Sequence, residues 1–249
     1  MKGKFLPNEF DHGKALSLSF EALTSMIAMR AGATEFEAAQ QKAYQKAVGT
    51  SSGGGSPHIP AMGDVTNPCR AFMQQVYHAQ GSLLAIVELF YPDISKNQKK
   101  ERKGPWDRLA ERVNNSEGTD IFAKFLGQTV PFLKGVQNIR DCLDHKNVKG
   151  VVVRDFTLQP DGKIVAPTIE VDFRGTRQPP VTMSEFMPSV LNTLMYSFEM
   201  MIVHLANQYY KPPAPSPIYI DMPAKNRRFW KHVRFYYGSC WNREFIPIG

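Results

Sequence analysis

The stretch TDIFAKFLGQTVPFLKGVQNIRDCLDHK, residues 119–146, decides the fold because a long apolar helical pattern runs into a cluster of charged side chains. Its apolar residues recur three and four positions apart, which predicts a helix with one buried face. We expect Thr119 to cap this helix, and Pro131 to kink it or to split it in two. The predicted buried face consists of Phe122, Phe125, Leu126, Thr129, Leu133, Val136, Ile139 and Leu143.

The last turn of this helix is the candidate site, because it brings together an arginine, two carboxylates and a histidine. These side chains serve phosphate binding and proton transfer. Arg140 and Asp144 are four residues apart and share one helix face, while Asp141 and His145 share the neighbouring face. Arg140 and His145 lie about 140° apart around an ideal helix, so they meet on one ligand only if the helix end unwinds or a second copy faces it. The alternative is a charged helix end, with a histidine favoured by the helix dipole and a surface ion pair.

An earlier segment, residues 13–48, predicts one long helix, or two helices in series with a break at Gly32. We expect its larger apolar side chains to face the core. The predicted buried face consists of Leu16, Phe20, Leu23 and Ile27, continued by Ala31, Phe36, Ala39 and Ala43.

Capping signals mark the start of further helices. Asn67 followed by Pro68 is typical of an N-cap with a proline in the first turn, and Thr182 with Glu185 has capping-box spacing. The predicted helices cover residues 67–91, 106–113 and 182–210. The first of them has a predicted buried face of Phe72, Val76, Ala79, Leu83, Ile86 and Phe90.

One β-hairpin interrupts the helices. Residues 150–173 alternate apolar and polar side chains on both sides of a Pro160-Asp161-Gly162 turn. Residues 49–66 are rich in glycine and serine, which predicts a flexible loop. We therefore expect a mainly α fold: a helical bundle domain over residues 1–211 with an inserted hairpin, and an extended, proline-rich and then basic and aromatic segment over residues 212–249.

Composition sets the broad class of protein. The 249 residues carry a net charge of +7, which suits a phosphate-bearing partner but equally serves solubility. No apolar run approaches the roughly 20 residues of a membrane span, and no secretory signal pattern opens the sequence. We expect a cytoplasmic protein with no membrane association, with its three cysteines reduced. No histidine, cysteine or carboxylate spacing predicts a metal site, and no motif predicts a cofactor.

Basic residues gather in two other places. One is the polar run between Pro92 and Pro105, which is either a solvated loop or a phosphate contact. The other is the C-terminal segment, where cations alternate with aromatic side chains, as in proteins that bind single-stranded nucleic acid. The alternative for this segment is a strap across the bundle, with its aromatic rings buried. The candidate RNA-binding residues are Lys99, Lys100, Arg227, Arg228, Trp230, Lys231 and Arg234.

The sequence NIRDCLDH, Asn138 to His145, resembles the signature of the HEPN superfamily: arginine, a polar residue, three variable residues and histidine near the end of a helix. The resemblance implies a homodimer whose facing motif helices cleave RNA without a metal, as in defence and toxin systems. Arg140 would hold the scissile phosphate, and His145 would move protons between the 2′-hydroxyl and the leaving 5′-oxygen. Asp141 would orient His145 or the partner arginine, although asparagine is more usual at that position.

Two other functions stay open. Many HEPN-like proteins are non-catalytic binding modules, and in that case a helical face or the C-terminal segment would dock a partner. A purely structural helical protein would neither cleave RNA nor bind a partner.

Overall fold

The computed structural model describes residues 10–51, 58–92, 94, 103–116, 120–145, 150–209, 217–221, 235–241 and 244–247. The chain divides into two compact units, one of Ala15–Leu194 and one of Met1–Lys14 with Met195–Gly249. The described residues are mainly helical with short antiparallel sheets, as predicted. The helices are α1 (His12–Ser51), α2 (Thr66–Phe90), α3 (Pro105–Asn114), α4 (Asp120–Asp144) and α5 (Met183–Tyr209). The strands are β1 (Val151–Arg154), β2 (Thr157–Leu158), β3 (Ile164–Val165), β4 (Thr168–Phe173), β5 (Thr176–Thr182), β6 (Pro217–Asp221), β7 (Phe235–Trp241) and β8 (Glu244–Pro247).

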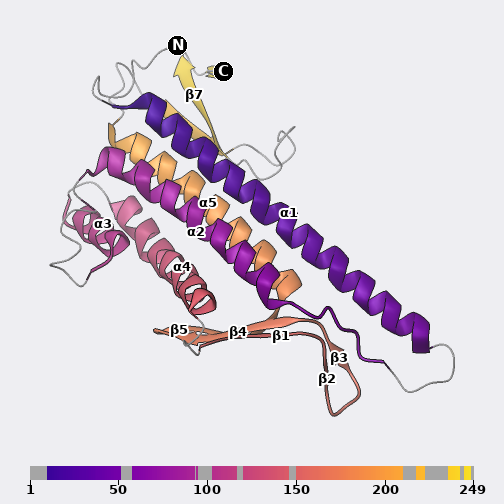
Figure 1. The fold of residues 1–249 in the computed structure, drawn as a ribbon. Helices are drawn as coiled ribbons and strands as arrows, with labels where there is room; N and C mark the ends of the chain where they lie inside the picture. The colour runs from indigo at the N-terminus through magenta and orange to yellow at the C-terminus, as the bar shows by residue number, and fades with distance from the viewer. Residues whose placement is uncertain are drawn as a thin grey trace. The chain divides into compact units, whose positions relative to one another are not determined.

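Helix α4 joins the other elements of the Ala15–Leu194 unit. It packs against α2 and α3, and it also contacts β1 and β4 (Figure 1). All eight residues of its predicted apolar face are buried, and so are all six on α2. The helix continues through Pro131, so the predicted split into two helices is wrong. Buried Gln80 of α2 donates from Nε2 to the backbone oxygen of Leu133 at 2.9 Å, which adds a polar cross-link between the two helices close to the proline.

Helix α1 is a single helix, but the prediction of its buried face is wrong. Leu16, Phe20 and Ile27 are 59%, 59% and 55% exposed, and Leu23 is 39% exposed. The buried side chains lie on a second stripe that also has spacings of three and four residues. The prediction chose the stripe with the bulkier side chains, whereas the buried stripe contains small and flexible ones. Its members are Ala22, Ser25, Met26, Met29, Phe36 and Ala47.

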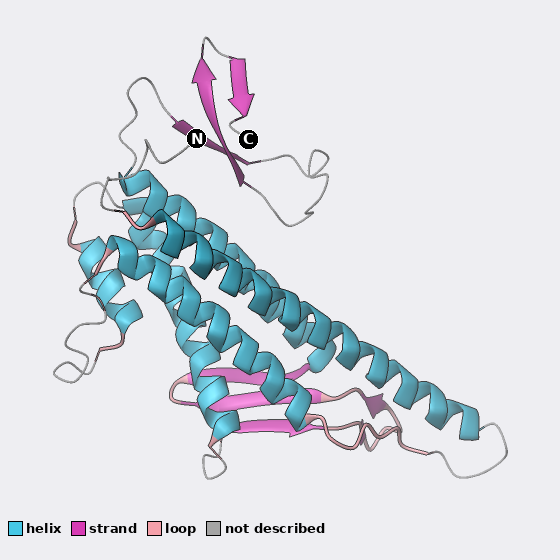
Figure 2. Ribbon diagram, turned by 45° about the horizontal axis from the view of Figure 1, so that its top comes forward, coloured by secondary structure: helices cyan, strands magenta, loops and turns pink. Residues whose placement is uncertain are grey.

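The predicted hairpin is present as two successive ladders. Strands β1 and β4 pair antiparallel with Val151 opposite Val171, and β2 and β3 continue toward the turn. The predicted Pro-Asp-Gly turn is confirmed: Gly162 has φ of 84°, and its N–H donates to the Gln159 oxygen at 2.9 Å. The hairpin therefore extends beyond the ends of α2 and α4, as Figure 2 shows.

Strand β5 is a third strand that the sequence pattern did not predict. It pairs with β4 after a two-residue turn in which Arg174 and Gly175 both have positive φ, 47° and 80°. The register shifts between Ile169 and Val171, which accommodates the prolines of β5 at the sheet edge. At its end Thr182 donates from Oγ1 to Glu185 Oε2 at 2.6 Å, at the predicted start of α5.

One carboxylate ties the sheet to the segment that leads into α2. Asp155 Oδ2 accepts hydrogen bonds from the backbone N–H groups of Met62 (2.9 Å) and Gly63 (3.1 Å). Asp155 Oδ1 accepts a third from Phe156 N at 2.8 Å. The end of the predicted flexible loop is therefore anchored, and the beginning of that loop is the last turn of α1.

In the second unit, β6, β7 and β8 form an antiparallel sheet in that order. Tyr219 is opposite Tyr237, and Cys240 is opposite Phe245. Residues 212–249 were predicted as one extended segment, and their described part is a three-stranded sheet instead. Alternating aromatic residues favour strands, which explains this outcome. Among the described residues of both units, no helix has the length and apolar character to span a membrane.

We expect Gly150→Ala to lower the free energy of unfolding by about 1–3 kcal/mol. A Cβ atom at Gly150 would lie 2.8 Å from the backbone oxygen of Asp172, and φ there is 155°. The change would also disturb the 2.7 Å hydrogen bond from Asp172 N to the Gly150 oxygen. Urea unfolding monitored by circular dichroism measures the effect.

The matched control is Gly127→Ala in α4, where an added Cβ meets no atom within 4 Å. This variant should be as stable as the parent or more stable by up to about 1 kcal/mol. Equal unfolding midpoints for Gly150→Ala and the parent would show that the β1 start tolerates a side chain.

Candidate functional site

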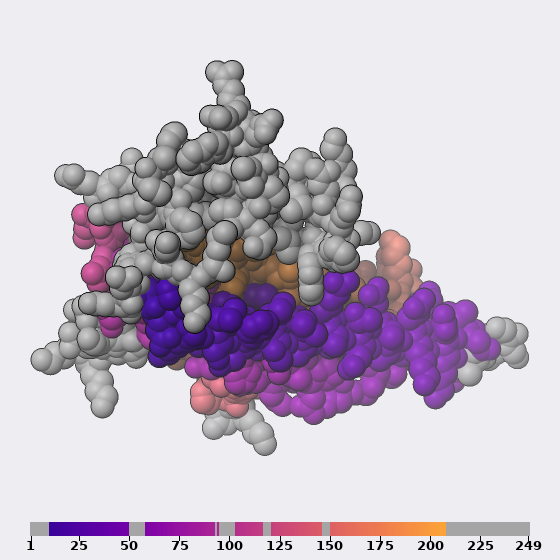
Figure 3. All heavy atoms as spheres, turned by 90° about the horizontal axis from the view of Figure 1, so that it is seen from above, coloured from indigo at the N-terminus to yellow at the C-terminus, as the bar shows by residue number. Residues whose placement is uncertain are grey.

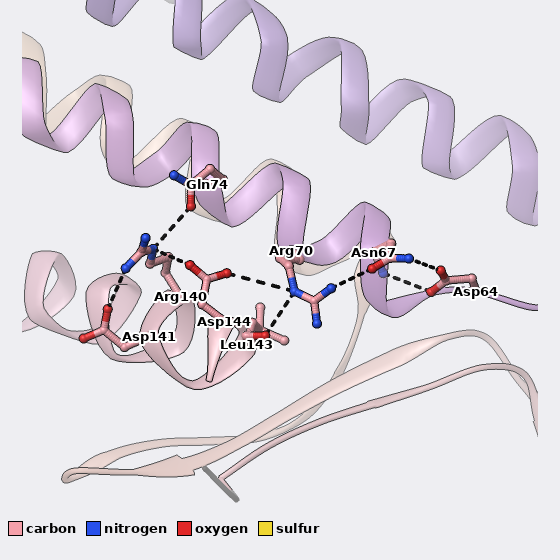
Figure 4. Close-up of polar contacts among 8 residues, drawn as sticks. All are labelled: Asp64, Asn67, Arg70, Gln74, Arg140, Asp141, Leu143 and Asp144. Carbon is pink, nitrogen blue, oxygen red and sulfur yellow. Dashed lines mark hydrogen bonds and ion pairs between the residues drawn. The ribbon is translucent and has the colours of Figure 1, made fainter. Parts of the chain in front are cut away.

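Arg140, in the last turns of α4, is held by groups from two helices. Its Nε lies 2.9 Å from Asp144 Oδ2 and 3.3 Å from Gln74 Oε1, and its Nη1 lies 3.2 Å from Asp141 Oδ1 (Figure 4). The guanidinium carbon lies 4.4 Å from the centre of the Tyr77 ring, which adds a cation–π contact. The predicted pairing of Arg140 with Asp144 is confirmed. Because two carboxylates contact one guanidinium, its positive charge is already compensated within the chain.

Arg70 of α2 forms the second half of the cluster. Its Nε donates to the backbone oxygen of Leu143 at 3.0 Å, and its Nη1 donates to Asn67 Oδ1 at 2.7 Å. Its Nε also lies 4.0 Å from Asp144 Oδ1. The carbonyl groups in the last turn of a helix have no partner within the helix, so Arg70 satisfies one of them. The cluster therefore links α2 to the C-terminal end of α4.

The start of α2 differs from the prediction. Asp64 Oδ1 accepts the backbone N–H groups of Thr66 (3.1 Å) and Asn67 (3.0 Å), which is the usual work of a capping carboxylate. Asn67 is not the N-cap: its side-chain amide donates to Asp64 and its oxygen accepts from Arg70. Pro68 does lie in the first turn, as predicted.

Asp141 contacts two arginines and not His145. Its Oδ1 pairs with Arg140, and its Oδ2 lies 3.9 Å from Nη1 of Arg174 in the β4–β5 turn. The predicted role of Asp141, orienting His145, would require the carboxylate to leave these partners. The three arginines Arg70, Arg140 and Arg174 thus surround the carboxylates of Asp141 and Asp144.

His145 lies immediately beyond α4 with an exposed side chain. Its backbone N–H donates to the Asp141 oxygen at 3.1 Å, which continues the helical hydrogen bonding by one residue. Within the residues that the structure describes, no hydrogen bond joins the His145 ring to Arg140 or Asp141. One chain therefore brings Arg140 and Asp141 together but leaves the histidine in solvent.

Sequence reasoning missed the contribution of α2. Gln74 joins Arg140 to His78, because its Nε2 lies 3.2 Å from His78 Nε2. The missed residues share a polar stripe with helical spacing beside the buried face of α2, and that stripe is visible in the sequence. Its members are Asn67, Arg70, Gln74, Tyr77 and His78.

The other predicted RNA-binding residues lie outside the described part of the chain. These are Lys99 and Lys100 in the basic run, and five residues near the C-terminus. The five are Arg227, Arg228, Trp230, Lys231 and Arg234.

Two cysteines flank the cluster as buried free thiols. Cys69 lies on α2 beside Arg70, and Cys142 lies within the Arg140–His145 motif. Burial raises the pKa of the Cys69 thiol to about 12, against the smaller opposing effect of the Arg70 charge. Burial also raises the pKa of Cys142, opposed by a hydrogen bond with the backbone of Val151. Both cysteines are packing residues rather than nucleophiles.

No protein-family model, curated protein sequence or solved structure matches this chain. The resemblance of Asn138–His145 to the HEPN signature stays a prediction.

We expect Arg140→Ala to lower the free energy of unfolding by about 1–2 kcal/mol at neutral pH. The change removes an ion pair, a cation–π contact and a hydrogen bond to α2, and it leaves Asp141 and Asp144 without their shared partner. Arg140→Lys should restore part of the loss, because it keeps the charge but not the planar guanidinium.

The control is Arg174→Ala, whose side chain is 65% exposed and lies 3.9 Å from Asp141. It should change stability by less than about 0.5 kcal/mol. If urea unfolding shows equal losses for Arg140→Ala and Arg174→Ala, Arg140 does not link α2 to α4.

The raised thiol pKa values predict that Cys69 and Cys142 resist alkylation in the folded protein. A thiol whose pKa lies above the solution pH is mostly protonated, and the thiolate is the reactive form. Iodoacetamide followed by peptide mass spectrometry at pH values from 7 to 9 measures this, with the urea-unfolded chain as control. Rapid labelling of native Cys69 at neutral pH would contradict its burial.

Proposed function

We propose that this chain is a non-catalytic helical interaction module, which uses an exposed apolar face of α1 to bind a protein partner. The observation that carries the proposal is the exposure of Leu16, Phe20, Leu23 and Ile27, large apolar side chains along one side of one helix. Single exposed apolar residues are common, whereas a contiguous apolar surface marks an interaction site.

The geometry of the α2–α4 cluster supports the same proposal. Arg140 would have to exchange Asp144 or Asp141 for a phosphate oxygen before it could bind RNA. The exchange loses an existing ion pair and brings a phosphate close to two carboxylates, which repel it. Arg140 is therefore better suited to link α2 to α4 than to stabilise a transition state.

RNA cleavage of the HEPN type is the second candidate function. It is favoured by one observation: His145 is exposed at the end of α4, five residues after Arg140, with the spacing of the HEPN motif. This function needs a second copy to complete the site, together with a rearrangement that frees Arg140 from its carboxylates.

A cleavage assay in EDTA distinguishes the two functions. We expect the parent, Arg140→Ala and His145→Ala to leave a mixed RNA substrate equally intact. His58→Ala is the matched control, since His58 is also exposed but lies far from α4 in sequence. Cleavage by the parent and His58→Ala that both other variants lose would establish the nuclease and overturn the proposal.

A further inference from the structure

The outer face of α1 has a regular repeat. The positions at alternating spacings of four and three residues from Leu16 to Val48 are all exposed, and together they follow one heptad register. Every large apolar side chain of α1 that is strongly exposed falls on this register: Leu16, Phe20, Leu23, Ile27, Tyr44 and Val48. The positions between Ile27 and Tyr44 carry Arg30, Thr34, Glu37 and Gln41. The α1 seam, as we call these positions, has the pattern of a two-stranded coiled coil.

We propose that the α1 seam binds the α1 seam of a second copy of this chain in antiparallel orientation, with the two-fold axis at the level of Gly32. The proposal rests on the interaction function proposed above and names its partner. In this register Leu16 meets Val48 of the second copy, and Phe20 meets Tyr44 of the second copy. The two apolar ends of the seam thus cover each other, and the polar positions lie together at the axis.

Charge selects the antiparallel orientation. In a parallel pair, Arg30 would face Arg30 of the second copy and Glu37 would face its equivalent, so like charges would meet twice. In the antiparallel pair, Arg30 and Glu37 of the second copy occupy neighbouring layers, about 5 Å apart along the helix axis. The long arginine side chain spans that separation. The same residues therefore oppose one orientation and favour the other.

Side-chain size also suits a close helix pair. The residues beside the seam on one flank are Ser17, Thr24, Ala31 and Ala38, which are small and exposed. Small flanking residues let two helices approach to about 8 Å. The six large apolar side chains expose roughly 100 Å² each, so two copies would bury on the order of 1,200 Å², the lower end of stable interfaces.

The first experiment measures molar mass by light scattering over a wide dilution series of the full chain. We expect a mass of twice 28.1 kDa at high concentration that falls to the monomer value on dilution. Phe20→Asp with Ile27→Asp should raise the dissociation constant at least about a hundredfold, tenfold for each charge placed in the seam. The control, Ala28→Asp with Ala39→Asp, adds the same charges to exposed positions of α1 outside the seam and should leave the dimer intact.

A second experiment tests the orientation by disulfide cross-linking in a Cys240→Ser background. The antiparallel register places Leu23 beside Gln41 of the second copy. Leu23→Cys and Gln41→Cys should each fail to cross-link alone and should cross-link when mixed. Cross-linking of Leu23→Cys with itself would show a parallel pair and overturn the proposal.

The outcomes separate this inference from the proposed function. A parent chain that stays monomeric, or a dimer that survives Phe20→Asp with Ile27→Asp, overturns the α1 dimer. Maleimide labelling of Phe20→Cys at high dilution then tests the face itself: rapid labelling leaves a free apolar surface for another protein. Protection at high dilution means that the chain covers its own α1 face, and both proposals fail.

Discussion

The buried apolar face of α4 is the constraint on which the Ala15–Leu194 unit depends. It packs against α2 and α3 and meets the sheet, so the other elements are placed by the surfaces that this helix offers. The polar cluster lies where that face ends. The last turn can present charged side chains to α2 because the preceding turns already hold the two helices at packing distance. The site is thus a consequence of the packing.

Much of the helical fold could be predicted because α2 and α4 each carry one dominant apolar stripe. Helix α1 shows where that reasoning stops. It carries two stripes with the same spacing, and periodicity cannot say which one faces the core. The core accepted the stripe of alanine and methionine, which lets helices pack closely, and left phenylalanine and leucine in solvent. Strand β5 was missed because its two prolines are atypical of strands, although a sheet edge tolerates them.

The candidate site could be predicted only in part, for a similar reason. Arg140 and Asp144 are neighbours on one helix, so local spacing is sufficient to pair them. Gln74 and Tyr77 reach Arg140 from 66 and 63 residues earlier in the chain, and no local pattern specifies such a contact. These distant partners decide the chemistry, because they turn a reactive-looking arginine into a cross-link between helices.

The carboxylate of Asp155 has a consequence for the order of folding. It binds Met62 and Gly63 across 93 and 92 residues of chain, so these bonds close a very long loop. The entropy of closing such a loop is recovered only after α2, α3 and α4 have shortened the path between its ends. During synthesis, the segment before α2 leaves the ribosome long before Asp155 does. The lead-in to α2 therefore waits for the sheet, and it is set in place after the helices that it precedes.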